Sequence, residues 1–220
     1  MLSMVSNVLT GSLNNTNLSK AIKTFLGFDP RSFTKLDGGD EALVYRFEAE
    51  SQTFVVHISP PWRTVAELAW AHQVALFAKR NVPQVVVPMV QNGQTFFQIE
   101  ERLAAIYPFI DGQMLDRDDP SQRNEAARLL AEIHQALLSW SGSIRPVSEE
   151  NKPEPHLNAP ELHDVALDEW WSTIQQRPLI TTATHGDYYR RNLLCHQGKI
   201  VGVIDWHDAT VRPLVMELAG

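Results

Sequence analysis

The sequence predicts an α+β fold in two lobes, a mainly antiparallel sheet followed by a mainly helical half. Three runs rich in β-branched and aromatic residues lie between residues 33 and 58 and are separated by turn residues. Beyond about residue 113, apolar residues recur at helical spacing. Two apolar runs, 193–194 and 200–204, flank a Gly-containing turn and predict a hairpin near the end of the chain.

The first half begins with a helix predicted over 17–26, where apolar residues recur every three or four positions. Asn17 is the expected N-cap and Gly27 the expected stop. The next three segments are predicted strands of an antiparallel meander, over 33–36, 42–47 and 53–58. Polar turns over 37–40 and 48–52 join them.

A long helix is predicted over 64–79, after Pro60 and Pro61 end the third strand. Asn92-Gly93 between apolar runs 85–89 and 95–99 predicts a hairpin whose two strands complete a five-stranded sheet. The run 104–112 is expected to be a strand edge that leads into a connection between the lobes.

The second half is predicted to contain helices over 124–140 and 162–176, with a Ser-, Pro- and Glu-rich loop between them. His134 lies on the apolar face of the first helix, where a hydrogen-bonded core role is the favoured interpretation. Trp170 and Trp171 either wall a cleft or anchor the lobe.

Composition excludes several classes. The chain has 220 residues, 44% of them hydrophobic, and can bury a sizeable core. A net charge of −7 argues against a nucleic-acid binder. One cysteine, Cys195, forms no internal disulfide, and no signal peptide or membrane-length apolar run is recognisable. We therefore expect a soluble, cytoplasmic protein that binds neither membrane nor nucleic acid.

The segment from His185 to Asp208, HGDYYRRNLLCHQGKIVGVIDWHD, carries the chemistry. The predicted hairpin brings Asn192, just before its first strand, beside Asp205, just after its second. Asp187 lies on the loop that enters the hairpin. Amide and carboxylate oxygens suit a hard cation such as Mg²⁺. The remaining carboxylate is then a candidate base.

The D-x-x-x-x-N spacing of Asp187 and Asn192, with HGD before it and Asp205-Trp206 after the hairpin, resembles the aminoglycoside phosphotransferase and choline-kinase-like family. That family has the protein-kinase fold. The resemblance implies that Asp187 is catalytic and accepts the proton of a hydroxyl, and that Asn192 and Asp205 hold Mg²⁺ on ATP. It also implies an N-lobe over 1–105, a hinge over 106–112 and a C-lobe over 113–220 that is expected to be incomplete.

The same resemblance implies a nucleotide site. Gly38 and Gly39 would cover the phosphates, although a hairpin turn needs glycines in any case. His57 stands where the family has a phosphate-binding Lys or Arg, and Glu67 is the only carboxylate on the helix that would pair with it. The Tyr107 carbonyl and the Phe109 N–H are the pair expected to bind adenine, since Pro108 has no N–H.

Near the end of the chain, Glu217 takes the place of the family's usual Asp beneath the catalytic loop. The chain stops soon afterwards, where family members continue. Either it is a fragment or its acceptor site is unusually open, and an exposed apolar patch with self-association is expected.

We predict an ATP- and Mg²⁺-dependent phosphotransferase whose acceptor is the hydroxyl of a small molecule such as an aminoglycoside, amino alcohol or sugar. Arg190 or Arg191 would face the transferred group or lie in solvent. Two alternatives stay open. One is a kinase-like nucleotide-binding protein without turnover. The other is a metal-dependent hydrolase that uses His185, Asp187, Asp205 and His207.

Overall fold

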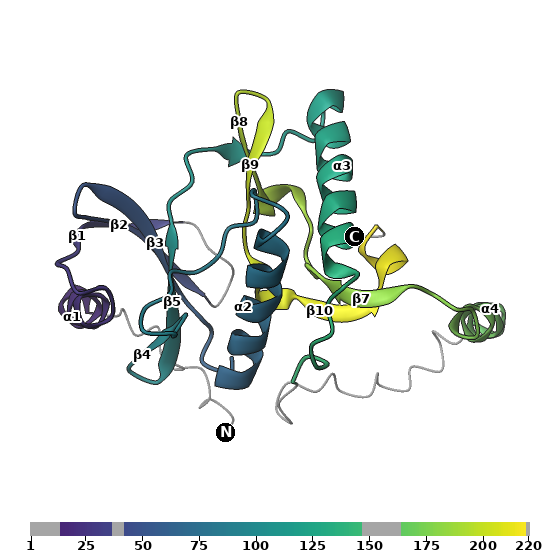
Figure 1. Ribbon diagram of the computed structural model, residues 1–220, viewed down its shortest axis with the longest axis horizontal. Helices are drawn as coiled ribbons and strands as arrows, with labels where there is room; N and C mark the ends of the chain where they lie inside the picture. Colours follow the sequence, from purple (N-terminus) through teal and green to yellow (C-terminus); the bar gives the residue numbers. More distant parts are fainter. Residues whose placement is uncertain (1–13, 37–41, 147–163, 219–220) are drawn as a thin grey trace, which may run out of the picture.

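The computed structural model describes residues 14–36, 42–146 and 164–218. A five-stranded antiparallel sheet and one helix form one end of the molecule, and a long helix stands between this sheet and the rest of the chain (Figure 1). A second helix, a three-stranded sheet and a two-stranded sheet follow. The predicted α+β architecture of sheet first and helices after is confirmed.

The large sheet has the order β1-β2-β3-β5-β4. Its strands are β1 Arg31–Leu36, β2 Leu43–Ala49, β3 Gln52–Ile58, β4 Phe97–Ile99 and β5 Arg102–Pro108. The helix α1, Asn15–Leu26, covers one face and buries Leu18, Ile22 and Leu26 there. Asn14, and not the predicted Asn17, caps α1, because the helix begins two residues earlier. Gly27 ends it with φ 88°.

The predicted strand over 85–89 is wrong. Val86 N–H donates to the carbonyl of Val203 at 2.9 Å, whereas Met89 N–H donates to Ile106 at 2.7 Å. The segment therefore divides its hydrogen bonds between the hairpin and β5, and the fifth strand of the sheet is β5 instead. The predicted turn at Asn92-Gly93 is present, with both residues at positive φ and the backbone of Gln91 and Gln94 paired across it.

The helix α2, Val65–Lys79, is buried on most of its surface. Trp70, Ala71 and Val74 share a core cluster with Leu129 and Ile133 of α3, Pro120–Leu137. In Figure 1, α2 accordingly stands between the large sheet and α3. The predicted lobe limits at 105 and 113 stay a prediction, and the packing shows that α2 contributes to the core of the helical half.

The segment 193–203 folds as predicted into a hairpin of β8 Leu193–His196 and β9 Lys199–Val203. A short strand β6, Gln113–Met114, adds to β8. A separate pair of strands was not predicted from the sequence: β7 Thr181–Thr184 and β10 Thr210–Pro213, which flank the hairpin along the chain. Short 3₁₀ turns η3 Arg190–Asn192, η4 Trp206–Asp208 and η5 Leu214–Glu217 complete this half.

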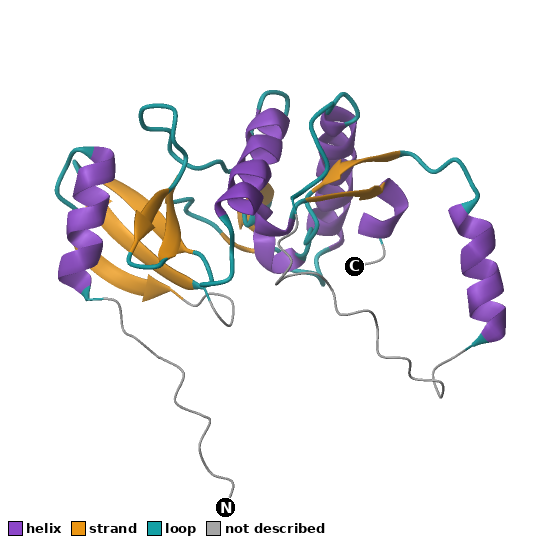
Figure 2. Cartoon of the chain, turned by 90° about the horizontal axis from the view of Figure 1, so that it is seen from below, coloured by secondary structure: helices purple, strands orange, loops and turns teal. Residues whose placement is uncertain are grey.

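The helix α4, Val165–Gln175, stands apart from the other elements (Figure 2). Trp170 is 56% exposed on it. Four apolar side chains near the end of the chain are also exposed: Ile180, Val215, Met216 and Leu218. Self-association through them stays a prediction.

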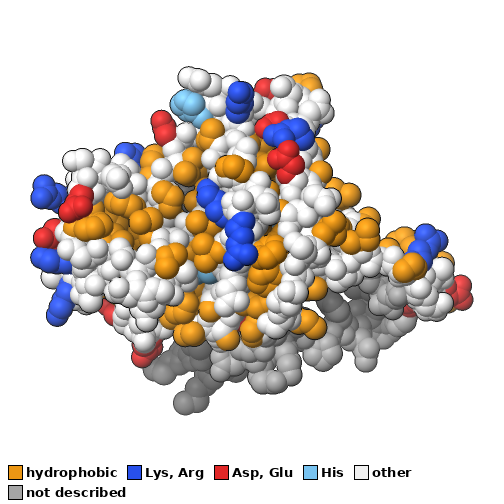
Figure 3. Space-filling view, in the orientation of Figure 1, with side chains coloured by type: hydrophobic (Ala, Val, Ile, Leu, Met, Phe, Trp, Pro, Cys, Tyr) orange, Lys and Arg blue, Asp and Glu red, His pale blue; other side chains and the backbone are white. Residues whose placement is uncertain are grey.

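Lys and Arg side chains are dispersed over the face in Figure 3 and form no continuous basic patch there. This agrees with the acidic net charge of −7. None of the helices in the described ranges is long and apolar enough to cross a lipid bilayer.

Candidate active site

The hairpin brings the two sides of the motif together at its open end. Leu193 pairs with Val203, and Ile204 N–H donates to the carbonyl of Asn192 at 2.9 Å. Asn192 therefore lies opposite Ile204, one residue before Asp205. At the closed end, Gln197 and Gly198 both have positive φ, as a two-residue hairpin turn requires.

Asp187 and Asn192 are joined directly. The Asn192 Nδ2 donates to the Asp187 Oδ2 at 2.8 Å and to the Asp187 carbonyl at 2.9 Å. These two bonds fix which way the amide faces, because its nitrogen points at Asp187. Its Oδ1 atom is left as an acceptor or a cation ligand. Arg191 lies 3.7 Å from the same carboxylate but is largely exposed, so this pair is weak.

His185 forms hydrogen bonds that connect the loop around Asp187 to Ile204, just after the second strand of the hairpin. Its Nε2 lies 2.9 Å from the Ile204 carbonyl, and its Nδ1 accepts from the Asp187 N–H at 3.2 Å. The ring is therefore the neutral Nε2–H tautomer, and burial lowers its pKa, partly opposed by the Ile204 carbonyl. Because both nitrogens are used in this way, His185 has no free lone pair for a metal ion.

Gly186 is required by the loop on two grounds. Its φ is 89°, and a Cβ atom there would lie 1.9 Å from the Asp208 carbonyl oxygen. The absence of a side chain lets the loop before Asp187 lie directly against the segment that follows Asp205.

Glu217 lies beneath this loop, as the sequence predicted. It accepts from Gly186 N–H at 2.7 Å and contacts Nε2 of His134 at 2.7 Å. His134 thus has the predicted hydrogen-bonded core role. Burial raises the pKa of Glu217, but the hydrogen bonds from His134 and Gly186 outweigh it and hold the pKa below its ordinary value.

Asp205 adopts a left-handed backbone conformation, with φ 62°. Its Oδ1 accepts from Nδ1 of His207 at 2.9 Å. Although burial raises the pKa of Asp205, the contact with His207 holds it well below its ordinary value, so the group is a carboxylate. Asp205 and Asn192 lie at the same open end of the hairpin, and carboxylate and amide oxygens are chemically suited to Mg²⁺.

His57 stacks on His207, with ring centroids 4.1 Å apart. Burial, followed by the neighbouring His207, holds its pKa well below the ordinary value. His57 is therefore a neutral ring in this structure and not a permanent cation at the position of the family's Lys or Arg.

The expected pairing of Glu67 with His57 is not found. Instead, Glu67 caps α2: its carboxylate accepts from the Thr64 N–H at 3.0 Å, and its own N–H donates to the Thr64 hydroxyl. This is a capping box, and the charged groups that act on the pKa of His57 do not include Glu67.

The expected adenine contacts at Tyr107 and Phe109 are wrong as well. Phe109 N–H donates to the Thr53 carbonyl at 3.1 Å, inside the sheet. In antiparallel strands every second residue pair is hydrogen-bonded. Val55 and Tyr107 are the next such pair after Thr53 and Phe109, so they are also hydrogen-bonded to each other. The two predicted groups are therefore used by β3. Gly38 and Gly39 lie outside the described residues.

Sequence reasoning missed the side chains of His72 and Tyr107. The Tyr107 hydroxyl lies 3.1 Å from Nε2 of His72 and 3.2 Å from Nε2 of His207. A histidine in the middle of the apolar helix 64–79 was the available signal, since such a residue needs a buried partner.

The metal-hydrolase alternative is not supported. Among the described residues, no three His, Cys, Asp or Glu side chains are grouped to hold a metal ion. His185 is committed to the backbone, and His207 lies between Asp205 and Tyr107.

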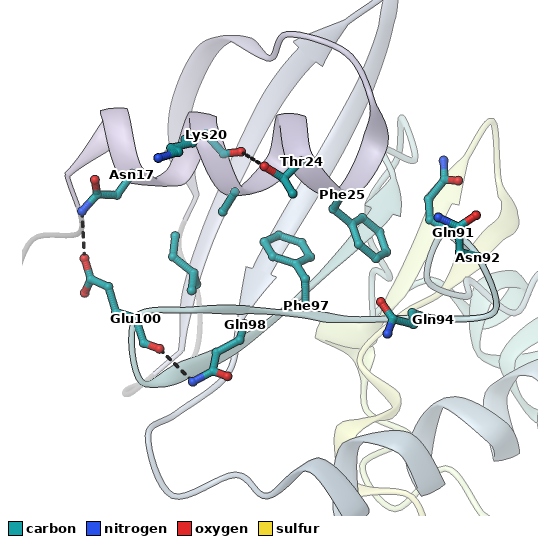
Figure 4. Close-up of a pocket in the computed structure, with 12 residues that line it drawn as sticks. Asn17, Lys20, Thr24, Phe25, Gln91, Asn92, Gln94, Phe97, Gln98 and Glu100 are labelled. Atoms are coloured by element: carbon teal, nitrogen blue, oxygen red, sulfur yellow. Dashed lines mark hydrogen bonds between the residues drawn. The ribbon is translucent and has the colours of Figure 1, made fainter.

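A cavity of about 540 Å³ lies elsewhere, between α1 and the segment 91–100 (Figure 4). Phe25 and Phe97 stack there with centroids 4.9 Å apart, and Asn17 is hydrogen-bonded to Glu100. No residue of the hairpin site lines it.

The sheet order and the hairpin agree with the kinase-like fold that the sequence predicts. Residues 32–220 match the model of the phosphotransferase enzyme family, and the chain belongs to this family. Solved structures with the same fold include aminoglycoside phosphotransferase APH(4)-Ia, with a TM-score of 0.63 and 18% identity over 94% of this chain and 76% of that chain. Spectinomycin phosphotransferase APH(9)-Ia, solved with ADP and spectinomycin, has a TM-score of 0.64 and 15% identity over 92% of this chain and 71% of that one.

Two curated relatives are kinases from Salmonella. Stress response kinase A of Salmonella choleraesuis (strain SC-B67) is 27% identical over 199 residues, which cover 81% of this chain and 59% of the relative. Serine/threonine protein kinase RdoA of Salmonella typhimurium (strain LT2) matches with the same identity and coverage. The chain thus spans about 59% of the length of these relatives.

Proposed function

We propose that this chain carries the ATP-binding and phosphotransfer centre of a kinase that moves the γ-phosphoryl group to a hydroxyl. The observation that carries the proposal is the pair of hydrogen bonds from Asn192 to Asp187 at the open end of the hairpin that also ends in Asp205.

Each side chain has a distinct role in this proposal. Asp187 accepts the proton of the attacking hydroxyl. Its Oδ2 is held by Asn192, and no hydrogen bond among the described residues engages its Oδ1, which would meet the hydroxyl. Oδ1 of Asn192 and the carboxylate of Asp205 would hold Mg²⁺, which when bound neutralises charge on the phosphates. His185, Gly186 and Glu217 keep the loop in this arrangement.

Adenine would be bound by the backbone carbonyl and N–H groups that lie two residues further along the chain than the predicted pair. The Tyr107 carbonyl and the Phe109 N–H are hydrogen-bonded to β3. The next backbone groups that point in the same direction are the Phe109 carbonyl and the Asp111 N–H, just beyond the end of β5. The neutral His57 would bind phosphate more weakly than a permanent cation.

Two acceptor classes are supported by different observations. The fold is shared with aminoglycoside phosphotransferase APH(4)-Ia, which was solved in a ternary complex with AMP-PNP and hygromycin B, and this favours a small-molecule hydroxyl. The relative named as a serine/threonine protein kinase favours a protein hydroxyl. A panel of aminoglycosides, amino alcohols and sugars, run beside a generic protein substrate with radiolabelled ATP, separates the two.

The test uses the purified chain with Asp187→Asn, Asp205→Ala and the control His196→Ala, an exposed residue on the same hairpin. We expect Asp187→Asn to bind Mg·ATP while transfer falls by at least 10²-fold. We expect Asp205→Ala to lose metal-dependent nucleotide binding, and the control to match wild type.

Nucleotide binding without acceptor-dependent ADP release, across both acceptor classes, would support a binding protein without turnover. The neutral His57 is the observation that favours this second candidate. Wild-type binding that is unchanged in Asp205→Ala refutes the proposed site.

A further inference from the structure

Five side chains form an unbroken series of hydrogen bonds that ends on the proposed metal ligand. The Thr95 hydroxyl lies 2.8 Å from Nδ1 of His72, and Nε2 of His72 lies 3.1 Å from the Tyr107 hydroxyl. The Tyr107 hydroxyl is 3.2 Å from Nε2 of His207, and Nδ1 of His207 is 2.9 Å from Oδ1 of Asp205.

The series connects parts of the chain that are far apart in sequence. Thr95 precedes β4, His72 lies on α2, Tyr107 lies on β5, and His207 lies in η4. His72 is 2% exposed and His207 is 8% exposed. The two histidines are therefore largely shielded from water, where a hydrogen bond orients its partners strongly, whereas the Asp205 side chain at the end of the series is 48% exposed.

The donor and acceptor in each hydrogen bond of the series can be assigned by starting from the Asp205 carboxylate. The carboxylate only accepts, so Nδ1 of His207 carries a proton. In the tautomer whose single ring proton is on Nδ1, Nε2 of His207 accepts from the Tyr107 hydroxyl, which burial keeps protonated by raising its pKa. The Tyr107 oxygen then accepts from Nε2–H of His72, which leaves Nδ1 of His72 to accept from the Thr95 hydroxyl. All five groups are satisfied, and the two histidines are opposite tautomers.

We propose that the series Thr95–His72–Tyr107–His207 is a positioning device that fixes the orientation of the Asp205 carboxylate toward Mg²⁺ from the side of α2 and the large sheet. The proposal rests on the function proposed above. His207 holds Oδ1 of Asp205, so the other carboxylate oxygen is aimed in one direction. Partners that orient a metal ligand typically change metal affinity by about 10- to 100-fold when they are lost.

The stacking of His57 on His207 supports this reading. Ring centroids 4.1 Å apart restrain the His207 ring from a second side, while its two nitrogens are held by Tyr107 and Asp205. A ring fixed at both nitrogens and on one face cannot flip without breaking all three contacts.

The first arm of the test is nuclear magnetic resonance of the nucleotide-free chain labelled with ¹⁵N at histidine, at pH 8. Two-bond proton–nitrogen spectra distinguish the tautomers, and each ring is assigned by loss of its signals in His72→Gln or His207→Asn. We expect the Nε2–H form for His72 and the Nδ1–H form for His207. The same tautomer in both rings overturns the series.

The second arm measures the affinity of the chain for Mn·ATP by electron paramagnetic resonance of free Mn²⁺. In His207→Asn the side-chain amide takes the place of Nδ1–H and still donates to Asp205. In His207→Gln the amide takes the place of Nε2 instead. We expect less than about 3-fold weakening for His207→Asn, about 10-fold or more for His207→Gln, and no change for the exposed control His196→Gln.

The outcomes separate the two proposals. Equal weakening in His207→Asn and His207→Gln, with wild-type binding intact, means that His207 only fills space and overturns the positioning role alone. No metal-dependent nucleotide binding by the wild type overturns the proposed function together with the positioning role.

Discussion

Acid should destabilise this fold through His72, and the size of the effect follows from its surroundings. The side chain is 2% exposed, and burial followed by the neighbouring His207 lowers its pKa from 6.5 to about 3. Because the folded-state pKa is depressed, the unfolded chain binds the additional proton between these values. Stability is therefore full above pH 6.5 and decreases as the pH falls through this window.

One proton corresponds to about 1.4 kcal/mol for each pH unit. Lowering the pH from 6.5 to 4.5 should therefore reduce the free energy of unfolding by about 3 kcal/mol through His72 alone. His57 and His185, whose pKa values burial also lowers, add to the loss in the wild-type chain.

The assay is urea unfolding at pH 7.5 and pH 4.5, for wild type, His72→Gln and His196→Gln. Glutamine can keep a hydrogen bond to Tyr107 or Thr95 but takes up no proton. The difference between the two pH values should therefore be about 3 kcal/mol smaller in His72→Gln than in wild type. The exposed His196 serves as the matched control and should leave the difference unchanged. Equal pH dependence in His72→Gln and wild type would refute the reasoning.

Two further changes test the support of the catalytic loop. Gly186→Ala should lower the free energy of unfolding by several kcal/mol, because its Cβ would lie 1.9 Å from the Asp208 carbonyl, whereas Gly198→Ala, with φ 77° but open space, should cost only about 1–2 kcal/mol. Thermal unfolding of both variants checks the contrast, and equal losses would contradict it. Glu217→Gln and His134→Gln should each destabilise by about 1.5–3 kcal/mol, and the double variant should lose less than their sum; full additivity would mean that the 2.7 Å contact contributes nothing.

The hairpin and its polar ends were predictable because the information is local. Asn192, Gly198 and Asp205 lie within fourteen residues of one another, and a two-residue turn fixes how the strands pair. Glu217 beneath the loop was also found, but through the resemblance to a family and not through any local pattern. Nothing in residues 214–218 alone predicts a contact with Gly186.

The errors concern partners that only the three-dimensional arrangement decides. The apolar run 85–89 has strand composition, but its hydrogen bonds go to Val203 and Ile106. The adenine contacts at Tyr107 and Phe109 were chosen by excluding Pro108, while the register of β5 on β3 determines which backbone groups are free. Glu67 was expected to pair with His57, but it forms a capping box with Thr64 at the start of α2.

The hydrogen-bond series through His72 and Tyr107 joins α2 to Asp205, and Arg63, just before α2, forms an ion pair with Asp208 at 3.3 Å. A buried ion pair between α2 and the third strand would cost desolvation of both charges, which attraction offsets only when the geometry is good. The neutral series through His72 and Tyr107 avoids that cost and still joins α2 to Asp205. It supplies no positive charge to the phosphates, since His57 is neutral as well. In the proposed function, the cation that Asn192 and Asp205 would hold neutralises charge on the phosphates, so the proposed activity depends on the orientation of Asp205.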